Sequence, residues 1–297
     1  VSSTNKHIQF FNVLGFKVPK YAHIAPFVKV DESTGNKRKL SKRKDPEAAV
    51  SFYHEKGVPV EAVMIYLATV ANSNFEAWFD CNKDAKIEDF KFEFKKIGSS
   101  GGALFDLDKL MNISKNYLSK LTKDEIYDRV LNYSKEFDTE FYDLLVKYED
   151  YSKSIFNIER EQKKPRKDYA TYADAKKQIW YMYDELFDKY FENYDFGKIT
   201  DKEEIKNIIN TYIDEYYDEN DDKDTWFNKI KELSEKLGYA GNMKEYKENP
   251  DAFKGNVADV STVIRVALTS SSMTPDLYEL LRLMGKDRIK ERFSKLN

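Results

Sequence analysis

The sequence predicts a mainly α-helical protein, and three observations carry this prediction. Beyond Gly102, apolar residues recur at intervals of three and four, which is the spacing of one helix face. Two capping boxes, Thr122–Glu125 and Thr200–Glu203, mark helix starts, because each joins a Thr to an acid three residues later. The 297 residues include only 11 Gly and 7 Pro, which argues against a β-rich or disordered chain.

The N-terminal part is expected to hold short elements that lead into a basic loop. A helix is predicted over Thr4–Leu14, because Ile8, Phe11 and Leu14 lie on one face at helical spacing. The apolar segment Ala22–Val30 is expected to be a strand, and the polar residues that follow it are expected to form a turn.

Two helices are predicted after the basic loop. Asp45 is expected to cap the first, Pro46–Lys56, and Gly57 to end it. The second helix covers Val60–Ala71. Its apolar stripe is expected to pack inward and consists of Val60, Val63, Met64, Leu67, Ala68 and Ala71. A less regular aromatic stretch follows, and the Gly- and Ser-rich run at 98–102 is the best linker in the chain.

Helices are predicted for most of the remaining chain. The expected helices lie at 107–118, from Thr122 onward, at 172–194, from Thr200 to about 217, at 226–237, at 257–269, and from Pro275 to Met284 with Gly285 as the stop. Within 257–269, the apolar residues Val260, Val263, Ile264 and Ala267 are expected to face inward. No β-hairpin is expected after Gly102, so this part is predicted to be two helical subdomains with a soft boundary near Gly197.

Composition limits the class of protein. Hydrophobic residues make up 41% of the chain and charged residues 34%, which is enough for a globular core. The single Cys81 permits no intramolecular disulfide, which favours a reducing cytosol. The three His residues are too scattered for a metal site or a catalytic triad, so no metal is expected. No apolar run approaches membrane-spanning length, so we expect a cytoplasmic protein without a membrane partner.

The basic loop at 35–44 is the strongest candidate site. It contains six cations and no acid, namely Lys37, Arg38, Lys39, Lys42, Arg43 and Lys44. Ammonium and guanidinium groups between a strand and a helix start suit a polyphosphate, because they can close on it and neutralise its charge. From charge alone, a solvated basic turn or a general polyanion patch is the favoured interpretation, because short motifs match by chance.

Other features allow two interpretations each. Lys163, Lys164, Arg166 and Lys167 surround a proline, and they suit either contacts to RNA phosphates or a solvated helix connection. The acidic run at 214–224 is interpreted as a solvated face that repels RNA. Trp180 and Trp226 could stack on unpaired bases, but their helical spacing favours the core. The net charge of −3 does not exclude RNA, because binding depends on where cations cluster.

The order of residues in the basic loop resembles a known signature. Lys39-Leu40-Ser41-Lys42-Arg43 resembles the KMSKS loop of class I aminoacyl-tRNA synthetases, in the form typical of the glutamyl and glutaminyl enzymes. Further blocks that look like this family, in the family's order, lie at 15–23, 101–110, 264–269 and 275–279. The helical tail is similar to that of bacterial-type glutamyl-tRNA synthetases, since the glutaminyl and archaeal-type relatives carry β-barrel anticodon domains.

The resemblance implies a division of the chain and a set of roles. Residues 1–44 would end the catalytic Rossmann domain, 45–100 would form the stem-contact region, and 101–197 and 198–297 would be two helical anticodon-binding subdomains. Lys42 would contact the ATP phosphates, with Lys39 and Ser41 shaping the loop and Arg43 supporting it. Lys163, Lys164, Arg166 and Lys167 would contact tRNA. The full-length enzyme would use ATP with Mg²⁺, glutamate and glutamate tRNAs, and would be a monomer.

One motif of the family is missing, and its absence shapes the expected activity. His23 opens His-Ile-Ala-Pro, which is not the HIGH motif of class I enzymes. We therefore expect a C-terminal fragment of a glutamate–tRNA ligase, which alone binds tRNA weakly, holds no cofactor and activates nothing. The alternative is a free-standing helical RNA-binding protein without catalysis. In addition, Ser270-Ser271 replaces the Gly-Arg common in the family, so no tRNA contact is assigned there.

Overall fold

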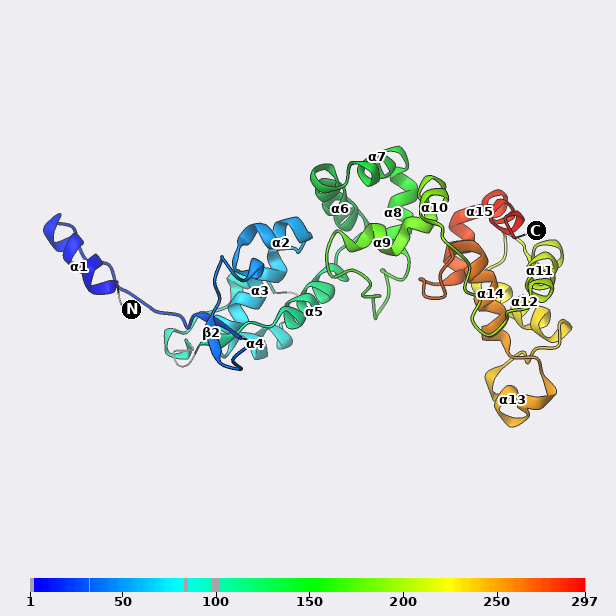
Figure 1. Cartoon of the computed structure of the whole chain (residues 1–297), viewed down its shortest axis with the longest axis horizontal. Helices are drawn as coiled ribbons and strands as arrows, with labels where there is room; N and C mark the ends of the chain where they lie inside the picture. The colour runs from blue at the N-terminus through cyan, green and yellow to red at the C-terminus, as the bar shows by residue number, and fades with distance from the viewer. Residues whose placement is uncertain (1–2, 32, 83–84, 98–101, 297) are drawn as a thin grey trace. The chain divides into compact units, whose positions relative to one another are not determined.

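The computed structural model describes residues 3–31, 33–82, 85–97 and 102–296. The chain is 61% helical with one small sheet, which confirms the predicted fold class. It forms two compact units (Figure 1): unit 1 is Val1–Leu118 with Tyr169–Tyr172, and unit 2 is Ser119–Asp168 with Ala173–Asn297. The four-region division stays a prediction, and apart from Gly102 the predicted linker lies outside the described residues.

The sheet of unit 1 has three strands in the order β2-β1-β3. β1 (Phe27–Val30) pairs antiparallel with β2 (Lys37–Lys39) and parallel with β3 (Ala103–Leu104). The predicted strand is therefore right in place but starts five residues later. Gly102 adopts φ +80°, and a Cβ there would lie 2.5 Å from Val28 Cγ1, so the close approach of β3 to β1 requires glycine.

Helices make up the rest of unit 1. They are α1 (Thr4–Val13), a 3₁₀ turn (Pro46–Ala48), α2 (Val50–Lys56), α3 (Val60–Ala71), α4 (Phe75–Cys81), two 3₁₀ turns (Ile87–Asp89 and Phe94–Lys96) and α5 (Leu107–Leu118). Gly57 ends α2 with φ 72°, as the sequence predicts, and its carbonyl accepts a 2.8 Å hydrogen bond from the amide of Tyr172. The Ser114 hydroxyl donates to the carbonyl of Ala170, so the distant segment Tyr169–Tyr172 completes unit 1.

The core of unit 1 is centred on Ala62, Tyr66 and Leu110. The ring of Tyr66 stacks on Phe27 of β1 at 6.0 Å, and its hydroxyl accepts a 2.8 Å hydrogen bond from the amide of Asp106. Aromatic pairing of this kind joins the sheet to α3 and, through the Asp106 amide, to the start of α5.

The predicted inward stripe of α3 is only partly right, because Val63 does pack against the core of unit 1 but the other large members of the stripe do not. Val60, Met64 and Leu67 are 73%, 48% and 39% exposed, whereas Ala62, Ile65 and Tyr66 are buried. The bounds of the helix are as predicted, but α3 carries apolar residues on all sides, so their spacing alone does not select a face. The large ring of Tyr66, with a hydrogen-bonding partner available in the core, selects the face that carries Ala62, Val63 and Tyr66.

Unit 2 is all-helical among the residues that the structure describes. Its helices are α6 (Lys123–Phe137), α7 (Thr139–Lys147), α8 (Glu149–Asn157), α9 (Asp174–Ile179), a 3₁₀ turn (Trp180–Met182), α10 (Asp184–Tyr190), α11 (Lys202–Thr211), a π-helical turn (Tyr212–Tyr216), α12 (Lys223–Lys236), α13 (Met243–Glu248), a 3₁₀ turn (Pro250–Ala252), α14 (Val257–Thr269) and α15 (Leu277–Ser294). The predicted inward face of α14 is confirmed, since Val260, Val263, Ile264 and Ala267 are fully buried.

The single long helix predicted over 172–194 is wrong. The chain instead runs through α9, a 3₁₀ turn and α10, and Tyr183 between them is extended with ψ 126°. Three consecutive residues, Tyr181, Met182 and Tyr183, are buried. The break coincides with the burial of Tyr183, whose hydroxyl donates to the hydroxyl of Ser152 of α8 at 2.8 Å in the interior of unit 2.

Helix starts in unit 2 follow the capping chemistry. The box at Thr122–Glu125 is confirmed. The cap of α11 is Asp201 rather than Thr200, because its carboxylate accepts from the amide of Glu203 at 3.0 Å. At Gly285 the backbone leaves the helical region as predicted, but a further helical stretch continues to Ser294.

Both tryptophans considered for base stacking make contacts inside unit 2. Trp226 is 8% exposed, and its indole Nε1 donates to the hydroxyl of Tyr212 at 3.1 Å. Trp180 is half-buried and stacks on Phe187 with ring centroids 5.7 Å apart. The core interpretation of these residues is therefore the right one. Within the described residues, no helix combines the length and apolar character needed to cross a membrane.

The corrected face of α3 leads to a stability prediction. Tyr66→Ala should lower the free energy of unfolding of unit 1 by about 3–5 kcal/mol, because it empties the core and leaves the Asp106 amide unpaired. Val60→Ala, on the exposed face, should change it by less than about 0.5 kcal/mol. Urea-dependent hydrogen exchange at the α5 amides measures both. Equal losses in the free energy of unfolding for the two variants would contradict the assignment of Val60 to the exposed face.

A surface network in unit 2 leads to a pH prediction. Glu140 accepts hydrogen bonds from Lys176 at 2.8 Å and Lys189 at 2.5 Å, and these lower the pKa of Glu140 to about 2. Because the folded-state pKa is depressed, the stabilisation is complete above the ordinary carboxyl pKa and is lost as the pH falls toward 2.

Glu140→Gln should therefore destabilise unit 2 at pH 7, and the difference from the unaltered chain should shrink below about pH 4. Unfolding experiments across this range measure it. Glu232→Gln is the control, because Glu232 is exposed and makes no ion pair with any residue that the structure describes. A pH-independent difference for Glu140→Gln would contradict the ionic origin.

Candidate functional site

The basic loop at 35–44 contains strand β2 and then runs on to the turn that begins at Pro46. Its first part is held by the sheet. Lys39 pairs with Val28 of β1, and the amide of Leu40 donates to the carbonyl of Phe27 at 3.0 Å. Two amides, those of Lys44 and Asp45, donate to the carbonyl of Ser41 at 2.9 and 2.8 Å. The loop therefore forms a compact turn that begins at the sheet and ends at Pro46.

One of the six cations points inward. Arg38 donates two hydrogen bonds to Asp45, from Nη1 at 2.6 Å and from Nη2 at 2.8 Å, and its Nε donates to Asp31 at 3.0 Å. The Asp45 carboxylate also accepts from the amide of Ser41 at 2.9 Å and is only 2% exposed. This bidentate pair links the strand before the loop to the residue that ends it.

The ionisation of this pair is fixed by its contacts. The hydrogen bonds from Arg38, followed by the one from the Ser41 amide, hold the pKa of the Asp45 carboxyl well below its usual range despite burial. The hydrogen bonds to Asp45 likewise raise the pKa of the Arg38 guanidinium. Both groups are therefore charged throughout the physiological pH range.

The Asp45 contacts correct the expected helix cap. The Asp45 side chain makes no capping hydrogen bond, because its oxygens are used by Arg38 and Ser41. Pro46 does occupy the first turn as predicted, but this turn is 3₁₀ and α2 begins only at Val50. The first-turn Glu47 accepts a 2.6 Å hydrogen bond from Lys29 of β1, which ties the turn to the sheet.

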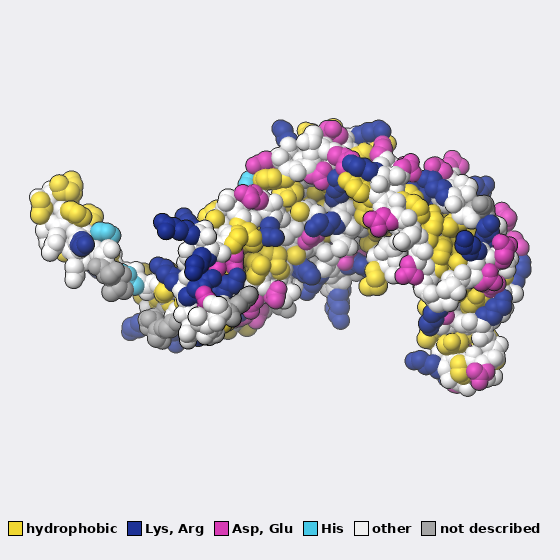
Figure 2. Space-filling view, in the orientation of Figure 1, with side chains coloured by type: hydrophobic (Ala, Val, Ile, Leu, Met, Phe, Trp, Pro, Cys, Tyr) yellow, Lys and Arg dark blue, Asp and Glu magenta, His cyan; other side chains and the backbone are white. Residues whose placement is uncertain are grey.

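The other five cations of the loop face solvent. Lys37, Lys39, Lys42, Arg43 and Lys44 are all exposed. None makes an ion pair with another residue in the described part of the chain. Figure 2 shows Lys and Arg side chains gathered at this end of unit 1. Five unpaired cations within eight residues form a surface that can bind a polyanion.

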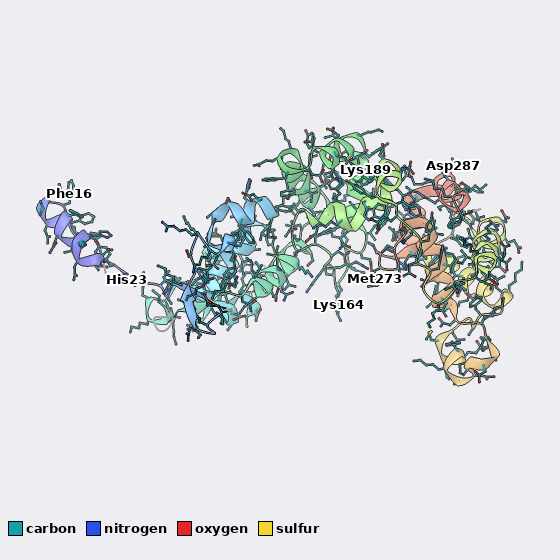
Figure 3. The ribbon with its side chains drawn as sticks, in the orientation of Figure 1. Phe16, His23, Lys164, Lys189, Met273 and Asp287 are labelled. Atoms are coloured by element: carbon teal, nitrogen blue, oxygen red, sulfur yellow. The ribbon has the colours of Figure 1, made fainter. Side chains whose placement is uncertain are left out.

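The second cationic cluster lies in the loop after α8 in unit 2. Lys163, Lys164 and Lys167 are exposed, and Figure 3 shows Lys164 at the loop tip, pointing away from the helices. Arg166 differs, because its Nε donates to Asp168 at 2.5 Å and its Nη1 to Glu159 at 3.2 Å. The predicted cluster thus divides into three solvent-facing lysines and one arginine that braces the loop.

Two non-glycine residues with positive φ shape the loops at this end of unit 2. Glu159 has φ 54° and Ser270 has φ 59°. The Glu159 carboxylate accepts from both Arg166 and the amide of Asp276, so it joins the two loops. Ser270 adopts a backbone conformation that favours glycine. Met273, in the connection between α14 and α15, is 80% exposed (Figure 3).

The acidic run is partly neutralised within unit 2. Lys229 pairs with Asp221 at 2.7 Å and Lys236 pairs with Glu215, whereas Lys223, the cation of the run itself, pairs with Asp276 outside the run at 2.7 Å. Asp222 caps α12 by accepting from the amide of Thr225. Among the described residues, no group of three or more His, Cys, Asp or Glu is placed to hold a metal ion.

Sequence reasoning missed two residues that organise these sites. Asp45 was visible as the first acid after six cations, a signal that it pairs with one of them. Glu159 gave no signal, because its partners Arg166 and Asp276 are brought together only by the fold.

Comparisons with known proteins agree with these features. The anticodon binding domain family matches residues 140–296. A glutamate–tRNA ligase from Clostridium perfringens (strain SM101 / Type A) is 47% identical over 296 residues, which are 99% of this chain and 53% of the relative. One from Acetivibrio thermocellus is 44% identical over 293 residues, which are 98% of this chain and 52% of the relative.

A solved structure supports the same fold. The crystal structure of a glutamate tRNA ligase from Elizabethkingia meningosepticum matches with a TM-score of 0.62 at 16% identity, covering 99% of this chain and 54% of that one. At that identity the likeness concerns the fold alone. The chain spans about half the length of the curated relatives that it matches.

Proposed function

This chain belongs to the anticodon binding domain family and matches the C-terminal half of glutamate–tRNA ligases, and we propose that it serves as that half of such a ligase. In the full-length enzyme, glutamate would attack the α-phosphate of ATP to form glutamyl-adenylate and release pyrophosphate. The glutamyl group would then pass to the 3′ end of a glutamate tRNA. The observation that supports a phosphate-handling role is the set of five exposed, unpaired cations in the basic loop.

The loop would contribute electrostatic stabilisation. Lys42 would contact the ATP phosphates, with Lys39 and Ser41 shaping the loop and Arg43 supporting it. Negative charge builds up on the leaving pyrophosphate, and fixed cations stabilise that charge more in the transition state than in the ground state. Mg²⁺ would enter with ATP, and the exposed loop residues, which include no carboxylate, suit the phosphates rather than the metal.

Unit 2 would bind the anticodon arm of the tRNA. Lys163, Lys164 and Lys167 are suited to the RNA backbone, because lysines position RNA through its phosphates. Arg166, which is shared between two carboxylates, would hold their loop in shape. The full-length enzyme would act in protein synthesis in the cytoplasm, as a monomer. Without the HIGH motif, this chain alone would bind tRNA weakly and form no adenylate.

The phosphate role leads to a kinetic prediction. In the full-length ligase, Lys42→Ala should slow ATP–pyrophosphate exchange by about 100-fold or more, because one preorganised charge is removed from the transition state. The dissociation constant for tRNA should stay nearly unchanged. Lys56→Ala, at the exposed end of α2, is the matched control and should leave the exchange rate near that of the unaltered enzyme. Equal losses in exchange and tRNA binding would contradict the division of roles.

The RNA role leads to a salt prediction. Replacing Lys163 and Lys164 together by Ala should weaken tRNA binding and reduce the magnitude of the slope of log K against log salt by about 1.4–1.8, since each lost phosphate contact contributes about 0.7–0.9. Replacing the exposed Lys244 and Lys247 of α13 is the control and should leave the slope unchanged. Filter binding at several salt concentrations measures both. An unaltered slope in the first variant would identify the cluster as a solvated connection.

A further inference from the structure

We propose that Arg38 and Asp45 are positioning residues that hold the basic loop ready for the polyphosphate, an inference that rests on the proposed function. Their ion pair would do this in two ways. It closes the base of the loop, and it keeps the buried carboxylate away from the cations that bind the ligand.

The closing role follows from where the two residues lie. Arg38 sits on β2, in register with Lys29 of β1, so its backbone is fixed by the sheet. Asp45 directly precedes the turn that begins at Pro46. The two parallel hydrogen bonds between them, 2.6 and 2.8 Å long, fix both distance and orientation, which a single contact cannot do. The six residues from Lys39 to Lys44 are thereby held as a closed turn.

The same carboxylate reaches the centre of the loop. Asp45 Oδ2 accepts from Arg38 and also from the amide of Ser41, which lies between Lys39 and Lys42 in the chain. The Ser41 carbonyl in turn accepts from the amides of Lys44 and Asp45. Both the amide and the carbonyl of Ser41 are therefore hydrogen-bonded, and Lys39 and Lys42 on either side of it project from a fixed backbone.

The protecting role follows from charge. The three neighbouring cations Lys42, Arg43 and Lys44 repel one another. Asp45 is the acid nearest to them in the sequence and would attract them. A carboxylate without Arg38 would pair with one of these cations and neutralise part of the site. Because Arg38 engages both oxygens of Asp45, the exposed cations keep their full charge for an anionic ligand.

Arg38 is suited to this task and Lys is not. A guanidinium presents parallel donors to both carboxylate oxygens, and its Nε remains for Asp31 at 3.0 Å. An ammonium is a point charge that cannot make the bidentate pair. Arg38→Lys therefore keeps the charge and removes the geometry, which separates the two contributions.

Hydrogen exchange tests the closing role on the 297-residue chain itself. Asp45→Asn and Arg38→Lys should each accelerate exchange of the Ser41 amide by about 10- to 100-fold, because they weaken its charge-assisted hydrogen bond. Lys37→Met removes a neighbouring cation without touching Asp45 and should leave this amide unchanged. A Ser41 amide that exchanges equally fast in all four proteins would overturn the proposal.

Kinetics in the full-length ligase tests the consequence for ATP. Arg38→Lys and Asp45→Asn should lower kcat for ATP–pyrophosphate exchange about 100-fold and raise the KM for ATP, while the KM for glutamate changes little. Glu76→Gln, which breaks the separate Lys109–Glu76 pair of unit 1, should change none of these values. A purely structural pair would shift the two KM values together, and that result would contradict positioning.

The two levels of the proposal fail differently. If Lys42→Ala leaves exchange intact, the loop does not handle ATP and the proposed function is wrong. If Lys42→Ala strongly slows ATP–pyrophosphate exchange but Arg38→Lys and Asp45→Asn exchange at the rate of the unaltered enzyme, only the positioning role is wrong.

Discussion

A buried carboxylate requires a charged partner, and in unit 1 this requirement determines the shape of the most basic segment of the chain. Asp45 is almost fully buried, so it must be paired to avoid a large desolvation cost. The guanidinium of Arg38 donates to both oxygens of Asp45, and the Ser41 amide donates a further hydrogen bond to Oδ2. A loop of like charges, which on its own would spread apart, is thus folded around one anion.

In unit 2 the packing of large, mostly aromatic side chains plays the corresponding part. Tyr181, Met182 and Tyr183 are all buried, and Trp180 stacks on Phe187 of the following helix. The backbone leaves the helical region at Tyr183, between these packed side chains. The result is a set of short helices joined by tight turns, from which the loops bearing Lys164 and Met273 project.

The sequence predicted those features that depend on local chemistry. The bounds of α3 and α14, the cap at Thr122 and the stop at Gly57 follow from spacing, side-chain caps and glycine, and each is present. The face of α3 could not be predicted, because the helix is apolar on every side and only the docking of Tyr66 against Phe27 decides it. The break at Tyr183 likewise depends on a core formed by distant residues.

The candidate sites divide in the same way. The order of residues at 39–43 pointed to the loop, and the run at 163–167 pointed to a cationic connection. The division of each cluster into solvent-facing and bracing members could not be predicted, because Arg38 and Arg166 look like their neighbours in the sequence. What distinguishes them is the position of Asp45 and Glu159, which the three-dimensional structure alone provides.

The segment Tyr169–Tyr172 has a consequence for the order of events during synthesis. It belongs to unit 1 although about fifty residues of unit 2 precede it, and the amide of Tyr172 bonds to the carbonyl of Gly57. A nascent chain that has reached Leu118 therefore still lacks the segment Tyr169–Tyr172 of unit 1. That unit becomes complete only after helices α6, α7 and α8 have left the ribosome, so the maturation of the two units is interleaved in time rather than sequential.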